Sequence, residues 1–395
     1  MAKNILVSAA SLTFNVLFKI CKSRVPRDEV VFLSRQTNVP SFDFEEIARE
    51  FERRGWKTHM HLKKVSNRNL PSYALHVLKE LRLLGVCKIA VLDRYDPVVS
   101  LLEFDCEQSG VTSFGEMSRD ASCVNTQFPR RPVVLQIWHA FGAFKKFGHQ
   151  SVGTPEGHSA VFTSTFNIHR NYSWVFCSGE GARKGFAEAF SCPIERVVAM
   201  DRPEYDELAL KARERARTHG SDESGRVKVL MAPTLRINEE SAHPFRELYG
   251  HRAMFEHALG EAGARIMWSF HPLESDLPAP GNVSQQLLDC DCVVTDYSSI
   301  VYEAYLLGIP VFFYIPDIQS YRESPGLNTD PASTSATLCA FSEEQLVDLL
   351  TSFARSPQSY SRDALETFAA SAFEIPLERS SSAASRIVDF ALAHV

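Results

Sequence analysis

Short apolar runs alternate with segments of helical periodicity along most of the chain. Helical patterns such as 44–55 and 73–85 separate the apolar runs, and 382–394 predicts a final helix. In the first half, the predicted strands are VVFLS (30–34), THMHL (58–62), KIAVLD (88–93), VVLQIWH (133–139), WVFCS (174–178) and VVAM (197–200). Strands separated by helices in this way are typical of βαβ units and a parallel sheet.

The same alternation repeats after a polar interruption, ARERARTHGSDESGR (212–226), which predicts a helix end followed by a linker. The second set of predicted strands is VKVLMAP (227–233), RIMWSFHP (265–272), CVVTD (292–296) and PVFFYIP (310–316). A length of 395 residues suits two domains, at roughly 100–200 residues each. We therefore predict two Rossmann-like α/β domains, 28–220 and 221–395, that face each other across a cleft.

Composition narrows the class of protein. Apolar residues make up 45% and charged residues 23%, as in soluble globular proteins. Lys plus Arg is 42 and Asp plus Glu is 48, so the net charge is −6, and we predict no nucleic-acid partner. The nine cysteines are scattered without a C-x-x-C pair, which argues against a disulfide framework or zinc site and favours reduced, intracellular thiols.

Residues 1–27 form a distinct basic segment with an apolar face. The uncharged run from Asn4 to Phe18 has 15 residues, fewer than the ~20 needed to span a bilayer. The segment carries five basic residues and no acidic one, and Leu6, Leu12, Leu17 and Ile20 recur at helical spacing. It predicts a basic amphipathic helix on an anionic membrane, or alternatively an ordinary helix packed on its own domain.

The densest candidate chemistry lies at 289–317. A buried strand ends in Asp296, followed by Ser298, Ser299 and a helix that contains Glu303. The carboxyl ends of parallel strands are where open α/β sheets bind ligands, and hydroxyls at a helix N-terminus suit a phosphate. Glu303 could then accept hydrogen bonds from a ribose. The alternative is an ordinary serine N-cap with an acid in the first turn.

Three more clusters follow predicted strands. One strand ends at His271-Pro272, and another leads through His139 and a glycine-containing loop to Lys145 and Lys146. A histidine and a lysine pair in one loop suit a phosphorylated substrate, although a core histidine beside solvated lysines would give the same pattern. The segment LMAPTLR (230–236) adds Thr234 and Arg236.

Two other patterns argue for chemistry that we do not predict. Asp289-Cys290-Asp291 is a D-x-D, but it precedes its strand and so faces the wrong end of the sheet for a metal site. Residues 179–185 approximate a dinucleotide fingerprint with the third glycine displaced by one, so an NAD(P) oxidoreductase stays a minority interpretation. The chain has neither a P-loop motif nor a G-x-S-x-G nucleophile elbow.

In this order, the clusters resemble the CDP-glycerol glycerophosphotransferase family of teichoic acid and capsule polymer primases and polymerases. The resemblance covers roughly 130–330, with three departures. Ala140 follows the histidine, the loop before the lysines is one residue longer, and a G-M-P-R-x-D element is reduced to 199–202, which contains Arg202. The matching residues are Trp138-His139, Lys145-Lys146, Gly148, Ala232-Pro233-Thr234, Arg236, His271-Pro272, Asp296-Tyr297-Ser298-Ser299, Glu303, Phe313-Tyr314, Asp317 and Tyr321.

The resemblance implies a GT-B-like architecture and transfer of glycerol phosphate from CDP-glycerol to a lipid-linked or polymeric acceptor, with release of CMP. It implies a metal-independent enzyme without cofactor, cytoplasmic and peripheral to the membrane. From their charge and apolar pattern, residues 1–27 are the segment that we expect to contact the membrane. His139 is expected to act as the base and His271 as the second catalytic residue. The expected donor-binding residues are Thr234, Arg236, Asp296, Ser298, Ser299 and Glu303, and the expected acceptor- or phosphate-binding residues are Lys145, Lys146 and Arg202.

Three alternatives stay open at this point. CDP-ribitol could replace CDP-glycerol as the donor. A UDP-sugar transferase or epimerase of the same fold would need the same contacts to a diphosphate. An inactive membrane-bound scaffold would be a different class of protein. The presence of both His139 and His271 argues against the scaffold.

Overall fold

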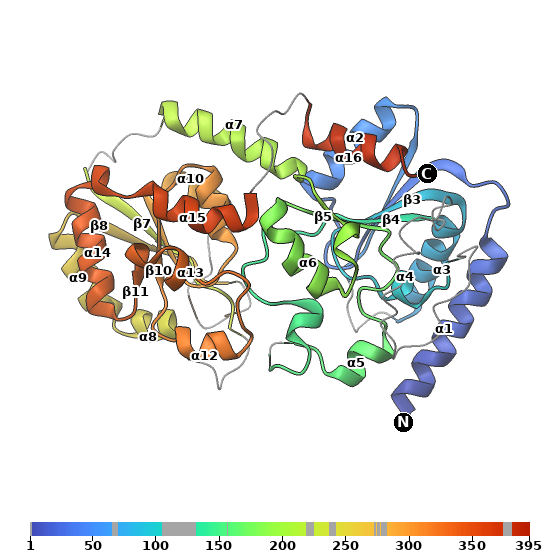
Figure 1. The fold of residues 1–395 in the computed structure, drawn as a ribbon, viewed down its shortest axis with the longest axis horizontal. Coiled ribbons are helices and arrows are strands. Elements are labelled where there is room, and N and C mark those ends of the chain that lie inside the picture. Colours follow the sequence, from blue (N-terminus) through green and yellow to red (C-terminus); the bar gives the residue numbers. More distant parts are fainter. Residues whose placement is uncertain are drawn as a thin grey trace.

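Two α/β domains lie side by side in the computed structural model (Figure 1). The structure describes residues 2–64, 70–104, 132–155, 157–218, 225–236, 242–271, 274, 277, 283–373 and 381–395. Helix α7 (Pro203–Thr218) runs along the top of the molecule from the first domain to the second. Its last part, 212–218, overlaps the polar stretch 212–226, which the sequence predicts as a helix end followed by a linker.

The first domain is built on a six-stranded parallel sheet with the order β2-β1-β3-β4-β5-β6. Its central strands are apolar and buried on both faces, as expected for a parallel sheet covered by helices. Each strand lies where the apolar runs predict one. The strands are β1 (Arg27–Ser34), β2 (Lys57–Leu62), β3 (Cys87–Leu92), β4 (Val133–Gln136), β5 (Trp174–Cys177) and β6 (Val197–Ala199).

Helices cover both faces of this sheet. Helix α2 begins at a Ser41 cap whose hydroxyl accepts from the Phe44 N–H, and its apolar residues lie buried on one face. Helix α4 begins at Asp96, whose carboxylate accepts from the N–H groups of Val98 and Val99. Between α1, described below, and α7, the first domain contains the helices α2 (Phe42–Arg53), α3 (Leu70–Val86), α4 (Pro97–Leu101), α5 (Ala160–Thr165) and α6 (Arg183–Phe190).

The second domain is built on a five-stranded parallel sheet with the order β11-β10-β9-β7-β8. Its strands are β7 (Val227–Met231), β8 (Ala264–Trp268), β9 (Cys292–Thr295), β10 (Val311–Tyr314) and β11 (Cys339–Ala340). Its helices are α8 (Pro244–Gly250), α9 (Arg252–Glu261), α10 (Val283–Asp289), α11 (Ile300–Leu306), α12 (Ile318–Glu323), α13 (Pro331–Thr334), α14 (Glu343–Arg355) and α15 (Arg362–Phe373). The two-residue strand β11 was not predicted.

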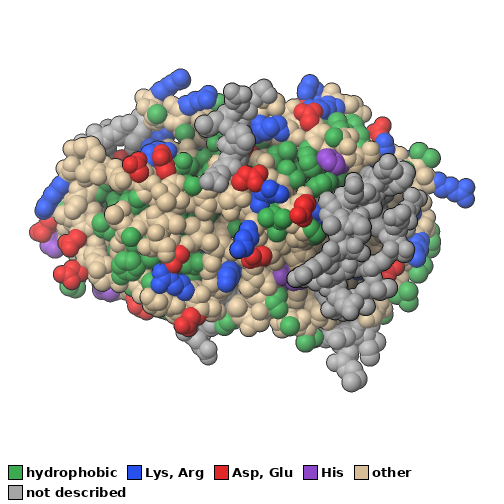
Figure 2. Space-filling model, in the orientation of Figure 1, with side chains coloured by type: hydrophobic (Ala, Val, Ile, Leu, Met, Phe, Trp, Pro, Cys, Tyr) green, Lys and Arg blue, Asp and Glu red, His purple; other side chains and the backbone are tan. Residues whose placement is uncertain are grey.

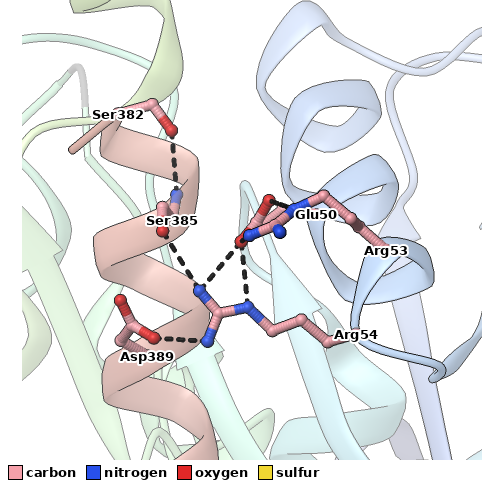
Figure 3. Close-up of polar contacts among 6 residues, drawn as sticks. All are labelled: Glu50, Arg53, Arg54, Ser382, Ser385 and Asp389. Atoms are coloured by element: carbon pink, nitrogen blue, oxygen red, sulfur yellow. Dashed lines mark hydrogen bonds and ion pairs between the residues drawn. The ribbon is translucent and has the colours of Figure 1, made fainter.

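The last helix, α16 (Ala383–Leu392), returns to the first domain (Figure 1). Its apolar face joins the core of the first sheet through Ala384, Ile387, Val388 and Ala391. Figure 3 shows how it is held: Arg54 at the end of α2 is paired with Glu50 and reaches Asp389 and Ser385 of α16. The sequence pattern assigned all of 221–395 to the second domain, whereas α16 packs on the first because its apolar stripe completes that core.

Helix α1 (Ala2–Cys21) lies along the outer edge of the first domain (Figure 1). Phe18 is buried against Phe104, and Asn15 both donates to the Leu101 carbonyl at 3.1 Å and accepts from the Glu103 N–H at 2.7 Å. Across the described residues, no helix has the length and hydropathy to span a membrane. One face of the predicted basic helix is therefore packed on its own domain.

The loop after β4 joins the two domains. Phe141 and Phe144 leave the first sheet and enter the core of the second domain, where Phe144 packs edge-on against Phe368 at 4.8 Å between ring centroids. Between them, Gly142 has a φ of +63°, and a Cβ there would come within 2.6 Å of the Tyr302 ring. Only glycine allows this close approach without displacing the aromatic ring.

Charged side chains of both signs are interspersed on the face shown in Figure 2. This mixture of signs agrees with the modest net charge of −6.

Candidate functional site

A cavity of about 320 Å³ lies between the two domains, where the carboxyl ends of four strands converge. Its lining comes from the loop after β4 in the first domain and from the segments after β7, β8 and β9 in the second. Seven residues singled out from the sequence line it together: His139, Lys145, Lys146, Thr234, His271, Ser298 and Ser299. The sequence therefore identified one connected site from segments more than 150 residues apart.

A second cavity of about 410 Å³ opens beside the first, mainly within the first domain. The two cavities share Trp138, His139, Lys145, Lys146 and Phe147. His139 therefore lies at the junction of two chambers, and each is within the size range of small-molecule sites.

The position of His139 is set by the residues just before it. Trp138 has a φ of +57°, rare for a non-glycine residue, and its N–H donates to the Gln136 Oε1 atom at 2.9 Å. Gln136 is fully buried at the end of β4, and its amide also donates to the Arg94 carbonyl at 3.1 Å. Gln136 thus fixes the loops after β3 and β4 together. No motif in the sequence pointed to it.

The protonation state of His139 follows from its contacts. Its Nδ1 atom lies 3.3 Å from the backbone carbonyl of Asp93, which can only accept, so Nδ1 carries the proton and Nε2 keeps its lone pair. Burial, with the positive charges of Arg94 and Arg202, lowers the pKa of His139 to about 3. The imidazole is therefore neutral near pH 7 and can accept a proton.

Asp296 and Arg236 belong to a buried ion-pair network below the cavity. Arg236 Nη2 lies 2.9 Å from Asp296 Oδ2, and Arg236 Nη1 lies 2.8 Å from Asp317 Oδ2. Asp317 also accepts from the Tyr297 hydroxyl at 3.0 Å, and Tyr297 stacks on Tyr321 at 3.6 Å. Both Arg236 and Asp296 thus make ion pairs or hydrogen bonds within the second domain. Their predicted role in donor binding stays a prediction.

The second domain lines the interdomain cavity with Thr and Ser side chains and with one histidine. The Thr234 N–H donates to Asp296 at 2.8 Å, and the buried Thr234 hydroxyl has no hydrogen-bond partner among the described residues. Ser298 and Ser299 precede α11, and the Ser299 hydroxyl makes no capping bond within the described part of the chain. His271 is exposed at the cavity, with its N–H donating to Glu274 at 3.2 Å; Pro272 lies outside the described residues.

Two predicted site residues lie beside the cavity rather than on its wall. Arg202 pairs with Asp43 at 2.7 Å and Glu204 at 2.6 Å, and lies over the Phe141 ring at 5.1 Å. Glu303, on α11, is close enough to Arg202 and Glu204 for their charges to affect its pKa. Burial, and then the nearby Glu204 carboxylate, raise the pKa of Glu303 to about 7. Its proposed contact with a ribose therefore stays a prediction.

Lys145 and Lys146 lie on the wall shared by the two cavities. Their backbone is pinned to the second domain, because the Lys146 N–H donates to the Gly326 carbonyl at 3.0 Å and Asn328 donates to the Lys145 carbonyl at 3.1 Å. Arg94 adds a third cation, from the loop after β3. Sequence reasoning missed Arg94, because it follows its strand without any recognisable motif.

The two rejected patterns have structural roles. Asp291 precedes β9, at the opposite end of the strand from the site, and accepts from the Lys228 N–H at 2.7 Å. A Cβ at Gly181 would come within 2.7 Å of the Ala370 carbonyl, so this glycine permits close packing between the two domains. Within the described residues, one group of three potential metal ligands occurs, His61, His76 and Glu80, and it lies outside the lining of both cavities.

A comparison with known protein families decides the membership of the chain. The sequence profile of the CDP-glycerol:poly(glycerophosphate) glycerophosphotransferase family matches residues 15–392. The chain belongs to this family. The family resemblance inferred from the motifs is thereby confirmed, and the match extends well beyond the 130–330 region that carries them.

Curated members of the family are enzymes of teichoic acid synthesis. A teichoic acid poly(ribitol-phosphate) polymerase of Bacillus spizizenii is 30% identical over 274 residues, 65% of this chain and 42% of the relative. A teichoic acid glycerol-phosphate primase of Staphylococcus aureus is 24% identical over 220 residues, 54% of this chain and 58% of the relative. The matched regions thus span about two-fifths to three-fifths of these relatives.

A similar solved structure confirms the architecture. The structure of the wall teichoic acid polymerase TagF superimposes with a TM-score of 0.63 at 16% identity, covering 100% of this chain and 98% of the other. The predicted GT-B-like fold of two facing Rossmann-like domains is confirmed. The family member described here therefore carries its candidate site between the two domains of a GT-B fold.

Proposed function

We propose that this protein transfers glycerol phosphate from CDP-glycerol to a hydroxyl of a lipid-linked or polymeric acceptor, with release of CMP. One observation carries the proposal: the neutral His139 lies at the junction of two cavities. Among the described residues, both cavities are lined by cations and no carboxylate. Such a site suits two anionic substrates that meet at one base.

The reaction follows from these groups. The acceptor hydroxyl loses its proton to His139 Nε2 as its oxygen bonds to the β-phosphorus of the donor. The bond from that phosphorus to the oxygen bridging to the α-phosphorus breaks, and CMP leaves with the electron pair. The negative charge of the diphosphate near His139 opposes the effect of Arg94 and Arg202, so donor binding raises the pKa of the base.

The donor would occupy the interdomain cavity. Ser298 and Ser299 offer hydroxyls beside α11, the buried Thr234 hydroxyl is without a partner among the described residues, and His271 lies on the same wall. Donors aimed at a transferring phosphoryl group stabilise the charge that develops there. We assign these residues to the diphosphate and retain metal independence as part of the proposal.

Ribitol phosphate transfer from CDP-ribitol is the second candidate. It is favoured by the names of two relatives from Bacillus spizizenii, the ribitol-phosphate polymerase at 30% identity and a ribitol-phosphate primase at 29% identity. The two candidates share donor chemistry and differ only in the length of the polyol.

Turnover of matched donors tests both candidates. CMP release is measured with CDP-glycerol, CDP-ribitol and a UDP-sugar, each with and without a glycerol phosphate or ribitol phosphate oligomer as acceptor. We expect acceptor-dependent CMP release from CDP-glycerol. Release from CDP-ribitol alone would select the second candidate, and turnover of the UDP-sugar alone would refute both.

We also propose that the protein acts at the cytoplasmic membrane surface through α1. On the helix face away from the domain, Leu12, Val16 and Ile20 are 68%, 50% and 75% exposed. Lys19 and Arg24 are exposed nearby, and each basic residue close to an anionic surface contributes about 1 kcal/mol. The apolar stripe and the positive charge together suit the surface of an anionic bilayer.

Substitution tests this better than deletion, because removing residues 1–27 would also remove the buried Phe18 and Asn15. We expect a variant with Leu12, Val16 and Ile20 changed to serine to sediment less with vesicles of phosphatidylglycerol and phosphatidylcholine. In the control variant, Met254 and Leu210 are changed to serine; these residues are 75% and 63% exposed on other helices. Equal sedimentation of the two variants would contradict membrane binding by α1.

A further inference from the structure

Arg94 is a partly buried cation that the proposed donor chemistry does not use. It follows β3 and lines the 410 Å³ cavity, but not the interdomain cavity assigned to the donor. No hydrogen bond or ion pair of its guanidinium is present among the described residues, although Asp93 is close enough to influence its charge. A guanidinium has five N–H donors, so this one is prepared to bind an anion that enters the cavity.

The backbone around Arg94 is held on both sides. Its carbonyl accepts from the buried Gln136 amide at 3.1 Å, and two residues later Asp96 pairs with Arg35 at 2.5 Å. Between them, the Tyr95 hydroxyl donates to the Phe166 carbonyl at 3.1 Å. Because the backbone of this loop is fixed before the ligand binds, only the Arg94 side chain has to be ordered on binding.

The composition of the cavity wall selects the chemistry of the occupant. Three lining residues, Arg94, Lys145 and Lys146, are cationic, and none of the described lining residues is Asp or Glu. Gln36, Ser151 and His158 add polar groups that suit hydroxyls. An anionic ligand with several hydroxyls therefore fits this wall, and a cationic or wholly apolar ligand does not.

The cavity also has the right position for a second substrate. It meets the donor cavity at His139, whose Nε2 atom is the proposed base. A hydroxyl at the inner end of the 410 Å³ cavity can thus reach His139, while the rest of its molecule extends outward past Arg94. If the second substrate were only a water molecule, a cavity of 410 Å³ would not be needed.

We propose that the 410 Å³ cavity is the acceptor subsite and that Arg94 binds a phosphodiester near the growing end of a polyol phosphate chain. This inference rests on the proposed function for the identity of the transferred group. Arg94 sets the position of the acceptor, and the chain-terminal hydroxyl then lies at His139.

Kinetics of Arg94→Ala test the proposal, with Arg49→Ala as the control. Arg49 lies on α2 with its side chain 65% exposed and paired to Glu46, so the control removes the same charge from the same domain away from both cavities. A hydrogen-bonded charge pair contributes enough for the acceptor KM to rise about 10- to 100-fold in Arg94→Ala. We expect the donor KM to change less than about 2-fold, because Arg94 lies outside the donor cavity. Arg94→Lys should recover part of the affinity, because it keeps the charge but loses the planar fork.

A binding measurement separates this inference from the proposed function. Calorimetry without donor follows a short glycerol phosphate oligomer binding to the intact protein, Arg94→Ala and Arg49→Ala. If no CDP-polyol is turned over but only Arg94→Ala loses oligomer affinity, the proposed function fails and the subsite stands. Equal oligomer affinity in the two variants, or an equal rise of donor and acceptor KM in Arg94→Ala, would overturn the assignment of the cavity.

Discussion

Replacing Arg236 by methionine distinguishes a structural arginine from a donor-binding one. The side chains of Arg236, Asp296 and Asp317 are only 5%, 2% and 6% exposed. Arg236→Met keeps most of the apolar volume but leaves two buried carboxylates without their cation. The Arg236 guanidinium also lies 4.7 Å from the Tyr321 ring centroid and 5.4 Å from that of Tyr297, and these contacts are lost as well.

The size of the effect follows from this burial. Removing one partner of a buried ion pair destabilises a protein by about 3–5 kcal/mol, because an uncompensated charge remains. For a domain of this size, the melting temperature falls by roughly 2–4 °C per kcal/mol, so we expect a decrease on the order of 6–20 °C. In the same domain, the control Arg322→Met breaks a partly exposed pair with Asp330, which contributes about 0–1 kcal/mol.

Differential scanning calorimetry measures the transition of the second domain, and donor kinetics are recorded on the same samples at a temperature where both variants are folded. If Arg236→Met melts like Arg322→Met and only its donor KM rises, the structural reasoning is wrong. Arg236 would then be a donor ligand, as the sequence motif predicts.

Four further outcomes are expected. His139→Ala should lower turnover about 10²–10⁴-fold with little change in donor affinity by calorimetry, and a collapse of that affinity would make His139 a donor ligand instead. Ser298→Ala should raise the donor KM, and unchanged donor kinetics would move the nucleotide site elsewhere. Glu303 has a folded pKa of about 7, above its unfolded value of 4.5, so its contribution to stability is fully present below pH 4.5 and lost as the pH rises through 7. Urea unfolding should accordingly show Glu303→Gln to be more stable than the natural protein by about 3 kcal/mol at pH 8, and no more stable at pH 4. The same difference in unfolding free energy at both pH values would exclude this titration. EDTA should leave turnover intact, and a loss restored by Mg²⁺ would disprove metal independence.

The strands were predictable because each is a short apolar run between polar turns, and parallel strands buried on both faces keep that pattern. The site residues on the interdomain wall were predictable for a related reason: His139, Thr234, His271 and Ser298 all follow such runs, and the carboxyl ends of parallel strands share one edge of each sheet. Strand β11 was missed because two residues carry no periodicity.

Other features depend on contacts that local pattern does not encode. Arg94 lies in the loop after β3, and Gln136 lies at the end of β4, more than 40 residues later in the chain. Only the folded chain places them both beside His139. The ion pairs of Arg236 and the offset of Glu303 from the cavity wall depend on side-chain direction. Helix α1 could be predicted as amphipathic, but which of its residues face the domain depends on the position of Phe104 and Leu101.

The return of α16 to the first domain has a consequence for how the chain folds during synthesis. The second domain is contained in the stretch between α7 and α16, so its strands are all made before Ile387 and Val388 leave the ribosome. Until then, the core that these residues complete lies open along α2 and the first sheet. The domain translated first is therefore finished last, and its apolar groove stays exposed, and so prone to aggregation, while the second domain is made.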